Sequence, residues 1–153
     1  MPPASDTLHI TRLFPCSLQR LWNAWSDWPT ALKWWGPADW PAAFMEADFR
    51  VGGEWRAELR SAKGESLWQS GRFLEIEPPK HLVFTFKWDS DNHEDGAGVE
   101  THVRITFAET PDGARMDFTQ SQLKSAESVT GHTHGWQSTF DRLHTFIGEP
   151  NHE

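Results

Sequence analysis

The pattern of apolar and polar positions predicts a first strand, two short helices, a series of strands and a long final helix. Residues 8–14 begin with alternating apolar and polar side chains, which is typical of a half-buried strand. Ser17 is a suitable N-cap for a helix that runs to Trp25, with apolar residues at helical spacing. Pro29 fits the first turn of a second short helix that runs towards Trp34.

The middle of the chain has the two-residue period of strands that bury one face. Strands are predicted over residues 44–49, 54–59, 66–77, 81–88, 100–108 and 115–120. Apolar residues change face across Gly71, which predicts a β-bulge there. Pro111-Asp112-Gly113 is a turn sequence, and the acidic segment 89–98 is expected to be a solvated loop that could gate a cavity.

The period changes to that of a helix near the end of the chain. Apolar residues from Val129 to Ile147 recur with helical spacing, so a helix is predicted that starts near Ser125 and ends at Gly148-Glu149-Pro150. Strands followed by a covering helix define an α+β fold. A chain of 153 residues suits one domain, expected over residues 7–148, with short tails at 1–6 and 149–153.

Charge and composition narrow the class of protein. The net charge of −8 and the scattered Lys and Arg residues argue against a nucleic-acid partner. No apolar run approaches the roughly 20 residues that a membrane span needs, and the first residues lack the features of a signal peptide. Cys16 is the single cysteine, which excludes an internal disulfide and suits a reducing compartment, so we expect a cytoplasmic location.

The aromatic content is the unusual property of the sequence, with ten Trp, ten Phe and no Tyr. Strand phase directs six of these rings inward, where they would face Trp136 and Phe140 of the long helix. They are Trp55, Phe84, Phe86, Trp88, Phe107 and Phe118. Trp34 and Trp35 could form the lip of a cavity, with at most one of them pointing inward. Such rings either line a cavity for a flat apolar ligand or close together as core.

Few residues indicate catalysis. Gln120 continues the inward phase of its strand, so its amide either reaches a ligand or is satisfied within the core. His132 and His134 are two apart, which in a helix directs them to different sides and argues against a shared metal ion. Glu58, Glu75, His102 and Arg104 fall mostly on the solvent face of their strands. We therefore predict no catalytic residue, no metal and no cofactor.

Several short motifs resemble one known family over nearly the whole chain, from about Leu8 to Ile147. They are Leu21-Trp22-Asn23-Ala24-Trp25-Ser26-Asp27, Trp34-Trp35-Gly36-Pro37, Gly52-Gly53-Glu54-Trp55, Glu77-Pro78-Pro79-Lys80-His81-Leu82-Val83-Phe84 and Gly135-Trp136-Gln137-Ser138-Thr139-Phe140-Asp141-Arg142-Leu143. In this order they resemble the family named for the activator of the heat-shock protein 90 ATPase. The resemblance implies a START-like, or helix-grip, fold in which a curved antiparallel sheet wraps around a long C-terminal helix with a cavity between them.

The resemblance implies no single reaction, because proteins of this kind bind chaperones, sequester lipophilic molecules or act as cyclases. Chaperone activators carry a second, N-terminal domain for which we expect no room in this chain, and this weakens the chaperone hypothesis. The leading hypothesis is non-enzymatic binding of a hydrophobic small molecule. The alternatives are an interaction module with a filled core, whose partner is a chaperone or a second copy, and a cyclase- or hydrolase-like enzyme.

Overall fold

A computed structural model describes residues 7–89, 100–123 and 126–148. The elements follow one another along the chain as β1 (Leu8–Phe14), α1 (Leu18–Ser26), α2 (Trp28–Ala31), β2 (Ala42–Ala47), β3 (Glu54–Arg60), β4 (Ser66–Glu77), β5 (His81–Trp88), β6 (Thr101–Thr110), β7 (Gly113–Ser121) and α3 (Ala126–Gly148). The expected tails, the loop beyond Asp89 and the proposed helix start at Ser125 lie outside the described residues.

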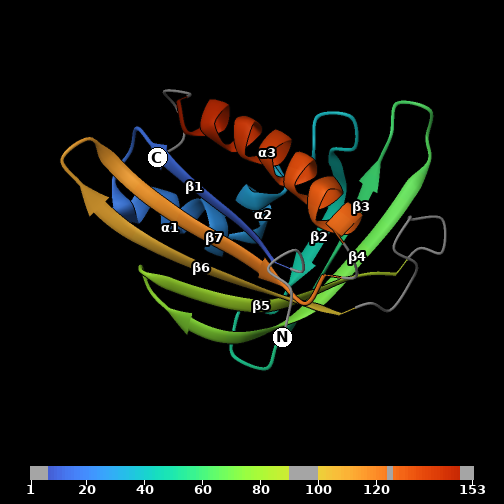
Figure 1. Ribbon diagram of the computed structural model, residues 1–153, viewed down its shortest axis with the longest axis horizontal. Helices are drawn as coiled ribbons and strands as arrows, with labels where there is room; N and C mark the ends of the chain where they lie inside the picture. The colour runs from blue at the N-terminus through green and yellow to red at the C-terminus, as the bar shows by residue number, and fades with distance from the viewer. Residues whose placement is uncertain (1–6, 90–99, 124–125, 149–153) are drawn as a thin grey trace.

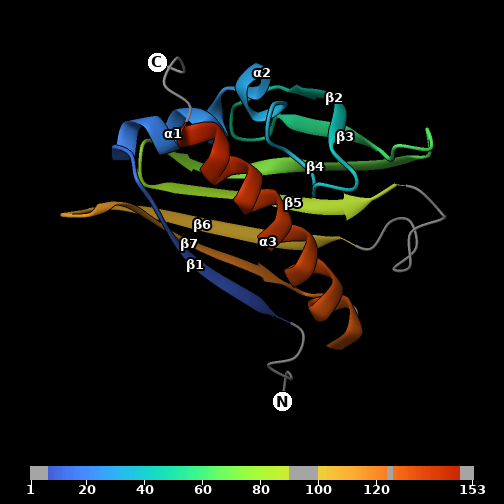
Figure 2. The same cartoon turned by 90° about the horizontal axis from the view of Figure 1, so that it is seen from above.

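The seven strands form one antiparallel sheet in the order β1-β7-β6-β5-β4-β3-β2. The first strand pairs with the last, so residues at opposite ends of the sequence become neighbours in the sheet. The sheet curves, and α3 crosses its concave side (Figure 1). Seen from above, α1, α2 and α3 all lie on this side of the sheet (Figure 2). The α+β helix-grip fold expected from the sequence is confirmed.

Local sequence explains how the first elements form and how the long helix is attached. Ser17 caps α1, because its hydroxyl accepts a hydrogen bond from the backbone N–H of Arg20. Arg12 of β1 reaches the long helix, where Nη1 donates to Asp141 at 2.7 Å and Nη2 to Gln137 at 2.5 Å. These bonds fix α3 to the edge strand of the sheet.

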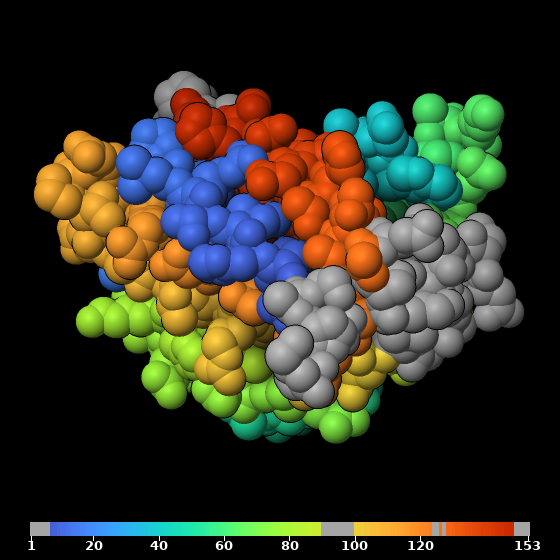
Figure 3. Space-filling view, viewed as in Figure 1, coloured from blue at the N-terminus to red at the C-terminus, as the bar shows by residue number. Residues whose placement is uncertain are grey.

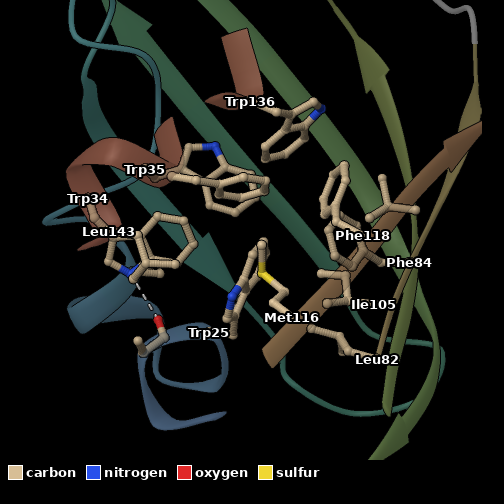
Figure 4. Packing of buried hydrophobic residues seen from close by; sticks show 14 of the residues in the cluster. Trp25, Trp34, Trp35, Leu82, Phe84, Ile105, Met116, Phe118, Trp136 and Leu143 are labelled. Carbon is tan, nitrogen blue, oxygen red and sulfur yellow. Dashed lines mark hydrogen bonds between the residues drawn. The ribbon is translucent and has the colours of Figure 1, made fainter. Parts of the chain in front are cut away.

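The concave face is filled by one aromatic cluster with Trp25 near its centre (Figure 4). The Trp25 ring lies 4.8 Å from that of Trp34 and 6.2 Å from that of Phe140. Trp34 is fully buried, and its Nε1 donates to the carbonyl of Ala24, which holds the segment after α2 against α1. The core therefore joins both short helices to the sheet and to α3.

The structure corrects three details of the predicted elements. The second helix is a single turn, Trp28–Ala31, and hydrogen-bonded turns continue the chain to Trp35. Strand β2 runs from Ala42 to Ala47 rather than from residue 44 to 49. Phe49 leaves the sheet because its ring packs on Phe73, with the ring centroids 5.0 Å apart.

The third correction concerns Gly71, which is not the site of the bulge. The register of β4 on β5 shifts between Phe73 and Glu75. Gly71 instead allows a close approach, because a Cβ there would lie 1.7 Å from the carbonyl oxygen of Thr85 and 2.5 Å from Trp55 Nε1. That indole donates to the same carbonyl at 3.1 Å, across the space that a side chain would occupy.

None of the helices in the described ranges is long and apolar enough to cross a membrane.

Candidate functional site

A cavity of about 560 Å³ lies between the first half of α3, the segment after α2 and the strands β3 to β5. The segment and the strands contribute Trp35, Gly36, Pro37, Trp40, Leu59, Glu65, Leu67, Gln69, Phe86 and Trp88. Helix α3 contributes Gly131, His132, Gly135, Trp136 and Thr139. At the surface, the orange half of α3 lies beside the cyan segment after α2 (Figure 3). The volume falls within the range of about 300–1,000 Å³ that is common for small-molecule sites.

Helix α3 presents two glycines to the cavity. Gly131 and Gly135 are four residues apart, so they occupy one face of the helix, and both line the cavity. A Cβ built on Gly135 would meet no atom within 4 Å. Glycine within a helix costs about 1 kcal/mol relative to alanine, so this position gives up helix stability although a methyl group would fit.

The walls are mainly the carbon faces of indole rings, because three indole N–H groups are bound within the protein. Trp35 Nε1 donates to Gln69 Oε1 at 3.0 Å, and Trp88 Nε1 donates to His132 Nε2 at 3.0 Å. Trp136 Nε1 donates to Gln120 Oε1 at 2.8 Å. These bonds leave the apolar parts of the three rings facing the cavity.

The bond from Trp136 is the first in a buried chain that links four elements. Gln120 Nε2 donates to Thr101 Oγ1 at 2.9 Å, and Thr101 Oγ1 donates to the carbonyl of Phe86 at 2.8 Å. The chain therefore runs from α3 through β7 and β6 to β5. It holds the Trp136 ring on the sheet while satisfying the amide of Gln120, which is fully buried.

Gln69 is the polar group that the cavity leaves incompletely bonded. Its side chain is only 5% exposed, and its oxygen accepts from Trp35. An indole nitrogen can only donate, so this bond fixes which end of the amide is oxygen. Within the described part of the chain, no group accepts a hydrogen bond from Gln69 Nε2. Because Gln69 lines the cavity, its amide nitrogen is a donor that a molecule in this mainly aromatic site can reach.

The segment that carries Trp35 is fixed to α3 by two side chains. Arg142 Nη1 donates to the carbonyls of Trp35 and Gly36 at 2.8 and 2.9 Å, and burial lowers the pKa of its guanidinium. Ser138 Oγ accepts from the backbone N–H of Ala38. Gly36 has a φ of 90°, and a Cβ there would lie 2.4 Å from the Trp40 carbonyl oxygen, so the turn requires glycine.

The charge around the cavity is sparse and acidic. Glu65 is exposed at its rim, and none of the described lining residues is Lys or Arg. Nearby, on the outer face of the sheet, Glu58 accepts hydrogen bonds from Ser66 Oγ and Arg60 Nη2. The bond from Ser66 and then that from Arg60 lower the pKa of Glu58. Although its strand phase points outward, Glu58 is only 8% exposed.

The structure divides the aromatic residues predicted for the site into three sets. Trp35, Phe86, Trp88 and Trp136 line the cavity together. Trp34, Phe107, Phe118 and Phe140 lie in the close-packed core, as does the satisfied amide of Gln120. Trp55 and Phe84 line a separate void of about 30 Å³ between the short helices and the sheet.

Sequence reasoning missed Gln69 and the glycines of α3. Gln69 has the same inward phase as Leu67, and Gly131 and Gly135 have the i, i+4 spacing of a helix face. The inward phase of Gln69 and the spacing of the two glycines can both be read from the sequence. Whether these residues border a cavity depends on the position of Trp35, which the turn at Gly36 brings onto β4 from a distant part of the chain.

His132 is held by the protein rather than directed at a ligand. Its Nε2 accepts from Trp88, and its Nδ1 donates to the carbonyl of Ser128 at 2.8 Å, which identifies the neutral tautomer with the proton on Nδ1. His132 and His134 both lie within α3, two residues apart. The described residues include no group of three or more His, Cys, Asp or Glu side chains that could hold a metal ion. Partial burial raises the pKa of the Cys16 thiol.

A curved antiparallel sheet closed by a long C-terminal helix, with a cavity between them, defines the START-like class of proteins. Residues 15–148 match the model of the family described as activator of Hsp90 ATPase homolog 1-like proteins. The chain belongs to this family, as the motifs in its sequence indicated.

Solved structures share the fold of this chain. A protein from Chromobacterium violaceum is 24% identical, with a TM-score of 0.82 over 95% of this chain and 99% of that chain. A protein from Arthrobacter aurescens is 26% identical, with a TM-score of 0.82 over 96% and 88%. A member of the same family from Silicibacter pomeroyi is 28% identical, with a TM-score of 0.79 over 91% and 95%. No curated protein matches the sequence.

Proposed function

We propose that this protein binds a hydrophobic small molecule, without chemical change, in the cavity between α3 and strands β3 to β5. The observation that carries the proposal is the cavity of about 560 Å³ whose indole walls have their N–H groups bound elsewhere. Burying about 300 Å² of apolar ligand surface would contribute roughly 7 kcal/mol before association costs. Those costs leave an affinity in the micromolar range.

Two features favour binding over the alternative functions. An interaction module with a filled core would not need glycines opposite the aromatic wall, because larger residues would stabilise the helix and fill the space. An enzyme would need a group positioned to transfer protons. Both ring nitrogens of His132, the histidine in the cavity wall, are bonded within the protein, and Glu65, the carboxyl among the described lining residues, is exposed at the rim. Binding in the cytoplasm, and as a single domain over residues 7–148, is part of this proposal.

The test is native mass spectrometry of the protein purified from its own cells, followed by fluorescence titration of any compound that is recovered. We expect an additional mass that dissociates on denaturation, and saturable quenching of Trp emission by that compound. Protein that carries no ligand, and that does not respond to a panel of lipophilic compounds, would contradict the proposal and favour an interaction module.

A matched pair of variants localises binding. Gly135→Leu places a side chain in the cavity, whereas Gly148→Leu makes the same substitution at an exposed position on the same helix, where a Cβ also meets no atom within 4 Å. Gly135→Leu should abolish binding while Gly148→Leu retains it. Equal binding by both variants would place the ligand elsewhere and overturn the proposal.

A further inference from the structure

The cavity has a polarity that limits which hydrophobic molecules fit it. Its indole N–H groups at Trp35, Trp88 and Trp136 are each bound to a protein acceptor. Gln69 Nε2, on a side chain that is 95% buried, has no acceptor among the described residues. Gln69 lines the cavity, so a ligand that carries an acceptor can replace water at this donor and form the hydrogen bond that the protein does not supply.

The charges at the cavity limit the ligand further. An anion would need a basic partner, and the lining residues within the described ranges include neither Lys nor Arg. Glu65 at the rim would repel an anion. His132 is neutral, because it accepts from Trp88 at Nε2 and donates to the Ser128 carbonyl from Nδ1. The acceptor on the ligand is therefore that of an uncharged group.

The shape of the walls favours a flat molecule. Gly131 and Gly135 expose a strip of helix without side chains, on which a planar ring system can lie. The Trp35 and Trp136 rings, which also line the cavity, meet at 90° with their centroids 5.6 Å apart and so present two indole surfaces to it. Trp88 and Phe86 are also perpendicular, at 84° and 5.5 Å, and contribute further aromatic surface for edge or face contacts.

Building on the proposed function, we infer that the ligand is an uncharged planar molecule with one hydrogen-bond acceptor, such as a ketone carbonyl, which binds Gln69 Nε2. The oxygen of the same amide remains bound to Trp35 Nε1. Gln69 thus joins the ligand to the aromatic wall and selects among apolar molecules by the acceptor that they carry.

Three naphthalene probes of similar size test this inference by equilibrium dialysis. They are 2-acetylnaphthalene, which has a neutral acceptor, 2-ethylnaphthalene, which has none, and 2-naphthoate, which is an anion. One hydrogen bond predicts that the ketone binds about 3- to 10-fold more tightly than the hydrocarbon. The anion should bind at least about 10-fold more weakly than the ketone, because it would enter the cavity without a counter-charge.

Variants assign the preference to one residue. Gln69→Met removes the amide donor but also the acceptor of Trp35 Nε1, so it is made together with Trp35→Phe, which removes that indole N–H. The double variant should bring the ketone-to-hydrocarbon affinity ratio close to one. Gln19→Met, the same substitution at an exposed position of α1, should leave the ratio unchanged. In the unmodified protein, the side-chain NH₂ resonance of Gln69 should shift on adding the ketone but not the hydrocarbon, which gives a test that does not depend on a variant folding.

The outcomes separate this inference from the proposed function. Equal affinities for ketone and hydrocarbon, both abolished by Gly135→Leu, would overturn the role of Gln69 and leave the binding function intact. Tighter binding of 2-naphthoate than of the ketone would overturn the uncharged class. No binding of any probe, or binding that Gly135→Leu does not change, would overturn both.

Discussion

Aromatic residues face both ends of α3, yet the two ends of the cluster are packed differently. Beneath the second half of the helix, Trp25, Trp34 and Phe118 close around Phe140 and Leu143, which are both fully buried. We call this the closed half. Beneath the first half of α3, Trp35, Phe86, Trp88 and Trp136 surround the cavity. We call this the open half.

The aromatic content is therefore not what distinguishes the two regions. The difference lies in the residues that α3 places opposite the rings. In the closed half the helix contributes Phe140 and Leu143, and in the open half it contributes Gly131 and Gly135 beside His132 and Trp136. The cavity of about 560 Å³ in the open half compares with a void of about 30 Å³ beside Trp25 and Phe84. In this protein the cavity lies where α3 carries two glycines, and the bonded indole N–H groups leave its walls mainly apolar.

The largest expected effect is the loss of unfolding free energy on replacing a leucine by alanine, compared between the closed and the open half. Leu143 is fully enclosed, whereas Leu67 borders the cavity and is 9% exposed. Leu143→Ala should lower the free energy of unfolding by about 4–5 kcal/mol, near the upper end of the range for buried leucine, because it creates a new void. Leu67→Ala should cost only about 2–3 kcal/mol, because its side chain already lacks contacts on one side. Urea denaturation measures both.

Equal losses for these two variants would show that the open half is as tightly packed as the closed half. The distinction between the halves would then be wrong. The comparison requires that the slope of unfolding free energy against urea concentration is the same in both variants and in the parent protein. An equal slope shows that all of them expose a similar surface area on unfolding.

Much of this fold could be predicted from the sequence, because strand and helix periods are set locally. Strands β4 and β5 have the bounds that alternation indicated, and the cap at Ser17 forms as expected. Strand β2 was less well predicted, since Phe49 is apolar whether it continues a strand or packs on Phe73. The inward phase of a ring is a local property too, but it does not distinguish Trp88, at the cavity, from Phe118, in the core.

Local sequence patterns could not predict which residues from other elements would contact each inward-facing side chain. Gln120 and Gln69 are both inward-facing amides on strands, and their sequences give no reason to treat them differently. Among the described residues, Gln120 has Thr101 and Trp136 as hydrogen-bond partners, whereas Gln69 has only Trp35. That distinction depends on the path of the chain through the turn at Gly36 and on where α3 crosses the sheet.

Replacing glycine by alanine at two positions should change the free energy of unfolding in opposite directions, depending on the space around each glycine. Gly71→Ala should lower the free energy of unfolding by about 1–3 kcal/mol, because its Cβ would lie 1.7 Å from the Thr85 carbonyl oxygen. Gly135→Ala should raise it by about 1 kcal/mol, because the Cβ meets open space and alanine favours the helix. Thermal unfolding without ligand distinguishes the two. Destabilisation by Gly135→Ala would mean that the cavity is narrower than the structure indicates.

The smallest expected effect concerns the stability of the hairpin formed by β3 and β4, which borders the cavity of the open half. Bonds from Ser66 and Arg60 lower the folded-state pKa of Glu58 below that in the unfolded chain. The resulting stability is present at neutral pH, above the ordinary glutamate pKa of about 4.3, and is lost as the pH falls through the lowered folded-state value. Glu58→Gln should therefore destabilise the protein at neutral pH and have progressively less effect as the carboxylate of the parent protein becomes protonated.

Chemical denaturation at a series of pH values measures this effect, with Glu46→Gln as the control. Glu46 pairs with Arg56 at 2.6 Å, but both side chains are more than half exposed, so solvent screens the pair. The same substitution there should change stability little at any pH. A Glu58→Gln penalty that persists at acidic pH would show that the shape of the side chain holds β3 to β4 and that its charge does not. The hairpin bordering the cavity would then be fixed by packing, as the closed half is.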